Sequence, residues 1–77
     1  MSESIGARAL EALGAAALSP RGMRLTAHPR AMRTLVELGY VIERQARWED
    51  AKPGELGRFI TPAGRELLAV LGSRDHG

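Results

Sequence analysis

The sequence predicts a small α+β domain whose elements follow the order helix, short strand, helix, two-stranded hairpin, helix. Apolar residues recur at helical spacing in three separate segments. A stretch rich in β-branched and aromatic side chains lies between the second and third of them, and prolines and glycines mark the turns. The 77 residues are 44% hydrophobic and 26% charged, which is typical of one folded domain with one core.

The first predicted helix runs from Ser2 to about Ala17. Serine is a favoured N-cap residue, and the apolar residues that follow it recur on one side of the segment. These residues are Ile5, Ala9, Leu13 and Ala16. Pro20 and Gly22 end the helix, and the next segment, residues 23–25, is predicted to form a brief strand.

The second predicted helix begins at Thr26 as N-cap, which places Pro29 in the first turn. Proline is tolerated there because a backbone N–H in the first turn has no partner within the helix. Its expected buried stripe comprises Ala27, Ala31, Leu35 and Leu38, widened by Met32 and Val36. Its expected outer face carries Arg30, Arg33, Thr34 and Glu37. Gly39 is predicted to take the left-handed conformation that ends helices, with Tyr40 folded back over the last turn.

A hairpin is predicted after this helix. Residues 40–48 alternate in character and contain β-branched and aromatic side chains, as expected for a strand. Residues 52–55 place proline and glycine at the two central positions of a type II turn. The chain should therefore reverse there and return as a second strand through residues 56–60.

The third predicted helix begins with Thr61 as N-cap and Pro62 at the first helical position. Its expected buried residues are Ala63, Leu67, Val70 and Leu71. Gly64 is interpreted as a position where this helix packs closely against another element. The helix and the predicted domain, residues 1–72, end together at a glycine, and residues 73–77 are predicted to be a flexible C-terminal tail.

Two segments are similar to parts of winged-helix regulators. Residues 35–41, LVELGYV, resemble the end of a recognition helix that runs into the first wing strand. Residues 59–68, FITPAGRELL, resemble the second wing strand and following helix of MarR-like and PadR-like regulators. The resemblance implies a minimal winged helix. Only residues 18–25 are available for the separate positioning helix of these families, so the helix-turn-helix is truncated and residues 26–38 take the recognition role.

The resemblance implies that the protein binds duplex DNA through the second helix and the wing hairpin. Between Ser19 and Ile60 there are eight basic side chains against five acidic ones, although the whole chain carries a net charge of only +2. Arginines on the recognition helix can donate hydrogen bonds to guanine or to phosphate, and basic residues of the wing can bind phosphate. The predicted nucleic-acid-binding residues are Thr26, His28, Arg30, Arg33, Thr34, Arg44, Arg47, Lys52 and Arg58.

Several of these features have alternative interpretations. The arginine face of the second helix also suits a solvated surface, with Glu37 as the i+4 partner of Arg33. Four acidic residues in the wing would repel phosphate, so the wing fits a protein surface nearly as well. Trp48 is expected to pack on the sheet face with Tyr40 and Ile42, and its alternative role is to anchor a partner protein.

The leading hypothesis is a bacterial or phage transcriptional regulator that binds DNA as a homodimer, because one recognition helix reads few bases. The alternative is a protein-binding adaptor or inhibitor, phage-encoded in keeping with its size, that engages a larger complex. Enzymatic activity is not expected, since no serine has a histidine and a carboxylate at suggestive positions.

The composition predicts a cytoplasmic protein without cofactor or metal. The absence of cysteine excludes disulfides and thiolate zinc sites, and a reducing compartment fits best. The two histidines, His28 and His76, lie far apart in the chain and lack neighbouring ligands, so they predict no metal site. No segment approaches the roughly 20 apolar residues of a membrane span, and no signal peptide is recognised, so no membrane partner is expected.

Overall fold

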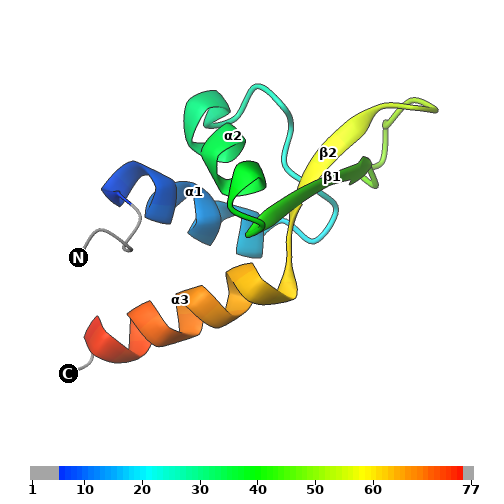
Figure 1. Ribbon diagram of the computed structural model, residues 1–77. Coiled ribbons are helices and arrows are strands. Elements are labelled where there is room, and N and C mark those ends of the chain that lie inside the picture. The colour runs from blue at the N-terminus through cyan, green and yellow to red at the C-terminus, as the bar shows by residue number, and fades with distance from the viewer. Residues whose placement is uncertain (1–5, 76–77) are drawn as a thin grey trace.

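The structure, a computed structural model, describes residues 6–75 and the side chains of residues 6–71. Its elements, shown in Figure 1, are α1 (Ala7–Ala17), α2 (Pro29–Glu37), β1 (Val41–Gln45), β2 (Leu56–Ile60) and α3 (Pro62–Asp75). The predicted α+β class is confirmed, and the order helix, helix, hairpin, helix fits the minimal winged-helix layout. The predicted brief strand is reduced to one bridge, between Met23 and Arg58. The segment between α1 and α2 forms turns and no helix, as predicted.

The core lies between α1, α2 and the inner face of the hairpin. Its largest fully buried side chains are Leu13, Met32, Leu35 and Val41. The predicted stripe of the first helix is confirmed at Ala9, Leu13 and Ala16. Small alanine side chains allow the neighbouring elements to approach α1 closely. The helix begins at Ala7 rather than after Ser2, which lies with Ile5 outside the described residues.

The second helix also begins later than predicted, at Pro29, and Thr26 lies in an exposed turn before it. The N-cap residue is His28, which has a left-handed backbone (φ 47°) and makes no side-chain cap hydrogen bond. A residue before proline is disfavoured in the right-handed helical region, so the helix does not extend back past Pro29. The predicted position of this proline in the first turn is confirmed.

The second helix ends as predicted, at a left-handed glycine. Gly39 has a φ of 84°, and its N–H donates to the Val36 carbonyl over 3.1 Å. The Tyr40 N–H donates to the Leu35 carbonyl over 2.9 Å, which completes a Schellman motif and folds Tyr40 against the core. Leu38, predicted to be buried, is 53% exposed because it is the C-cap residue, past the last inward-facing position of the helix.

The hairpin has the predicted turn and a shorter first strand than predicted. β1 and β2 pair antiparallel, with Val41 opposite Ile60. At the tip the Glu55 N–H donates to the Lys52 carbonyl over 2.9 Å, and Gly54 has a φ of 85°. These two observations confirm the type II turn.

Ile42 does not share a face with Tyr40 and Trp48 as predicted, because Val41 is the residue of β1 that points into the core. Val41 is 2% exposed and Ile60 packs against the core, whereas Ile42 is 39% exposed. Neighbouring residues of a strand point to opposite faces, so Ile42 shares the outer face of the hairpin with its pairing partner Phe59. Tyr40 is held on the core side by the turn that ends α2, and it therefore does not share a face with Ile42.

Thr61 caps the third helix as predicted and also ties it to the end of α2. Its Oγ1 accepts a hydrogen bond from the Gly64 N–H (3.1 Å) and donates one to the Gly39 carbonyl (2.8 Å). The helix continues to Asp75 rather than ending at Gly72, which corrects the predicted start of the tail. Across the described residues, none of the helices has the length and apolar character that a membrane crossing requires.

The inner side of α3 begins at the buried Gly64. The other inner residues are only partly buried, namely Leu67, Leu68 and Leu71. Ala63 and Val70 are exposed, contrary to the prediction, and Val70 is 51% exposed. Figure 1 shows that α3 diverges from α1 towards the C-terminus, which accounts for the incomplete burial of its leucines.

Candidate nucleic-acid interface

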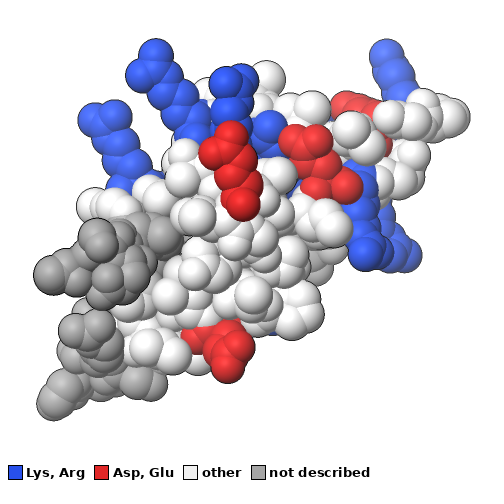
Figure 2. All heavy atoms as spheres, in the orientation of Figure 1, with Lys and Arg blue, Asp and Glu red and all other residues white. Residues whose placement is uncertain are grey.

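The outer face of α2 is exposed and basic. Arg30, Arg33 and Thr34 are exposed on the side of the helix opposite the buried Met32 and Leu35. Among the residues whose side chains are described, neither arginine makes an ion pair, and the i+4 pair between Arg33 and a glutamate does not form. Basic side chains project from the edge of the molecule over α1 and α2 (Figure 2). Two guanidinium groups are therefore available to a ligand.

The start of α2 adds an open hollow of about 350 Å³ beside this face. The hollow is lined by Arg8, Glu11, His28, Pro29, Arg30 and Ala31. His28 is half-buried there, and its side chain leaves the first N–H groups of the helix uncapped. Such N–H groups and neighbouring arginines favour a phosphate, whereas Glu11 opposes one. The sequence interpretation missed Arg8, whose place on the outer side of the first helix could have indicated it.

Arg58 is mostly buried and ion-paired, which speaks against its predicted contact with phosphate. Its side chain is 13% exposed and forms an ion pair with Glu43, with both Nε and Nη2 3.0 Å from Oε2. Nη1 is buried without a hydrogen-bond partner among the described residues. Arg58 therefore supports the hairpin from inside, whereas Lys52 is exposed in the turn at the tip of the hairpin.

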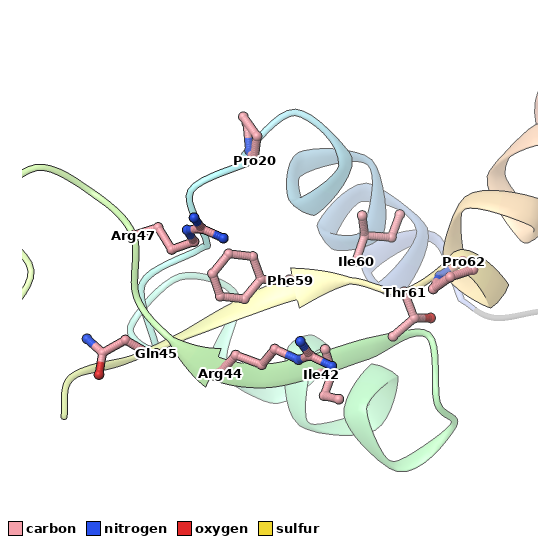
Figure 3. A pocket seen from close by; sticks show the side chains of 9 residues that line it. All are labelled: Pro20, Ile42, Arg44, Gln45, Arg47, Phe59, Ile60, Thr61 and Pro62. Atoms are coloured by element: carbon pink, nitrogen blue, oxygen red, sulfur yellow. The ribbon is translucent and has the colours of Figure 1, made fainter.

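Arg44 and Arg47 lie on a different surface from the outer face of α2. Arg44 shares the outer face of the hairpin with Ile42 and Phe59, while Val41 on the inner face enters the core beside α2. Both arginines border a groove of about 660 Å³. Figure 3 shows the groove, lined by Pro20, Ile42, Arg44, Gln45, Arg47, Phe59, Ile60, Thr61 and Pro62. The predicted residues are thus divided between two surfaces.

Trp48 is a packing residue that lies beyond the end of β1. It is half-buried, and the Arg24 guanidinium carbon lies 4.4 Å from its ring centroid. A Cβ atom on Gly57 would lie 3.0 Å from Trp48 Cζ3, so the indole also rests on β2. Arg24 pairs with Asp50 at 3.4 Å, an exposed contact. This cluster joins residues far apart in the chain. The sequence interpretation therefore predicted Tyr40 and Ile42 as the neighbours of Trp48, whereas its neighbours are Arg24 and Gly57.

The charge distribution separates the two surfaces further. Acidic side chains lie between the basic group over the helices and the basic group at the hairpin (Figure 2). Among the residues that the structure describes, no three histidine, aspartate or glutamate side chains are grouped as metal ligands would be.

Comparisons with known proteins give no independent assignment. No family model matches the chain, and no curated protein and no solved structure shows significant similarity to it. The assignment of a function therefore depends on the surfaces described above and on the winged-helix resemblance of the sequence.

Proposed function

We propose that this protein is a DNA-binding winged-helix module of a small bacterial or phage transcriptional regulator, with α2 as the reading helix. The observation that carries the proposal is the exposed pair of Arg30 and Arg33 without an ion-pair partner among the described side chains. An α-helix fits the major groove, and the guanidinium fork matches the acceptor atoms of guanine. This work would take place in the cytoplasm.

Phosphate contacts would hold the helix in the groove. Lys52 at the hairpin tip is exposed and suits the backbone beside the groove, as the wing of such a module does. The start of α2, with Arg8 nearby, suits a second phosphate. Arg44 and Arg47 face another direction and are not part of this contact.

The experiment that tests the proposal measures DNA affinity against salt concentration. We expect the protein to bind genomic fragments, including the region upstream of its own gene, at low salt. Each phosphate that is neutralised contributes about −0.9 to the slope of log affinity against log salt, so the two proposed phosphate contacts, at Lys52 and at Arg8 beside the start of α2, imply a slope of up to about −1.8 per copy. Fluorescence anisotropy measures this slope. Absence of binding at low salt would refute the DNA proposal.

We also propose that the module acts as a two-fold dimer through α3. The partly buried leucines of α3 and the exposed Val70 present an apolar surface near the C-terminus of the helix. Sedimentation at micromolar concentration is expected to show twice the 8.3 kDa mass of one chain. Val70→Glu should yield the monomer, and Ala69→Glu, which lies on the side of the same helix away from Leu67 and Leu71, should not. A wild-type protein that sediments only as a monomer would contradict this.

A further inference from the structure

We propose that the groove on the outer face of the hairpin binds an extended acidic segment of a partner protein, which adds a third strand to the free edge of β1. This surface is distinct from the outer face of α2, and the inference does not depend on DNA binding.

The first observation is that β1 has an unpaired edge. The Arg58 N–H and carbonyl bond with Met23, over 2.9 and 2.8 Å, and therefore point away from β1. Glu43 is opposite Arg58 in the register, so its own N–H and carbonyl point away from β2. The sheet has two strands, and no other described segment pairs with β1 on that side. An exposed edge of this kind accepts an added strand.

The second observation is that the groove on the outer face, which Ile42 and Arg44 of β1 border, has an apolar floor. Ile42 is 39% exposed, and Pro20 is exposed across the groove from it. The Phe59 ring between them is held in place by close contact with Gly22, since a Cβ there would lie 2.8 Å from Phe59 Cζ. The groove volume of about 660 Å³ lies within the roughly 300–1,000 Å³ of ligand sites. Apolar side chains of a bound segment would be buried there.

The third observation is the charge of the groove. Arg44 and Arg47 border it, are exposed, and make no ion pair with any described side chain. The nearest acidic residue of the edge, Glu43, is neutralised by its ion pair with Arg58 and does not offset them. A bound segment therefore meets positive charge next to apolar surface.

These observations together select the chemistry of the segment. In an added strand, residues opposite Ile42 and Arg44 lie two apart and point to the same face. The segment should thus carry an apolar side chain and an acidic side chain in alternate positions. A DNA backbone would leave the apolar floor unused, which favours a protein segment for this groove.

The test uses the full chain, labelled with ¹⁵N, and a synthetic peptide of roughly eight residues. Every second position of the peptide is in turn valine or glutamate, with threonine in the positions between, so that both kinds of side chain point to one face of the added strand. We expect saturable binding below about 1 mM, with the largest shifts at Ile42, Arg44 and Phe59. The amide of Glu43 should exchange with solvent at least about tenfold more slowly in the complex, because an added strand bonds that N–H. Slower exchange at Glu43 distinguishes strand addition from mere electrostatic attraction.

Variants and control peptides make the result decisive. Arg44→Glu/Arg47→Glu should weaken binding at least about tenfold, whereas the matched control Arg30→Glu/Arg33→Glu should change it less than about twofold. A scrambled peptide and a lysine analogue should bind at least about tenfold more weakly. The proposal is overturned if the scrambled peptide binds equally, if the shifts fall on α2, if no saturation is reached, or if short duplex DNA displaces the peptide from the groove.

Discussion

Replacement of Gly64 with alanine is expected to destabilise the fold by about 2–3 kcal/mol, and to lower the melting temperature by roughly 10–20 °C for a domain of this size. A Cβ at this position would overlap the Tyr40 carbonyl oxygen and would lie 2.8 Å from Ile60 Cγ1. The carbonyl oxygen cannot retreat, because it accepts the Thr61 N–H over 3.0 Å. Since small domains are stable by about 0.05–0.15 kcal/mol per residue, this cost is a large share of the total.

The matched control is Gly14, a glycine in the interior of α1. A Cβ on Gly14, in α1, would have nothing within 4 Å. Gly14→Ala should therefore stabilise the protein by about 0.5–1 kcal/mol, because alanine favours helix. Thermal unfolding followed by circular dichroism measures both variants. If Gly64→Ala also raised the melting temperature, α3 would not pack against the hairpin as described.

Removal of both arginines from α2 is expected to reduce affinity for the preferred DNA site at least about 30-fold. A guanidinium that reads a guanine contributes about 1–3 kcal/mol of discrimination, so Arg30→Ala/Arg33→Ala removes about 2–6 kcal/mol. The loss should be smaller on random DNA, since base contacts specify and phosphate contacts only position. Competition between the preferred site and random duplex measures the difference.

Two further variants distinguish recognition of bases from contacts to phosphate. Lys52→Ala should weaken preferred and random DNA alike and should reduce the salt slope by about 0.9. Arg44→Ala/Arg47→Ala should leave both affinities nearly unchanged, because these side chains border the groove on the outer face of the hairpin. If Arg30→Ala/Arg33→Ala lost affinity equally on both DNAs, α2 would bind the phosphates without recognising bases, and a loss for Arg44→Ala/Arg47→Ala would mean that the groove of the hairpin also contacts DNA.

The local signals in the sequence predicted their structures well. Gly39, the proline–glycine turn at residues 53–54 and the Thr61–Pro62 helix start all have the expected conformations. Each depends on the backbone preferences of one or two residues and on hydrogen bonds to near neighbours. Such features need no knowledge of the rest of the fold.

The features that depend on tertiary contacts were not predictable in this way. The predicted common face of Tyr40, Ile42 and Trp48 was wrong because the turn after α2, and not the alternation of the strand, decides that Val41 enters the core. Arg58 was counted among the surface cations, but Glu43 lies opposite it only once the register is known. The stacking of Arg24 on Trp48 likewise joins two loops that the sequence does not relate. The candidate site was therefore predicted on α2 and only in part on the hairpin.

The bridge made by Thr61 would fix the spacing between the two DNA half-sites that a dimer recognises. One hydroxyl joins the last turn of α2 to the first turn of α3, through Gly39 on one side and Gly64 on the other. If two copies associate through α3, the angle between each reading helix and the dimer axis is then set by this short connection and not by a flexible linker. The spacing between half-sites would be a fixed property of the monomer fold, so that inserting a single base pair between them could not be accommodated by bending of the protein.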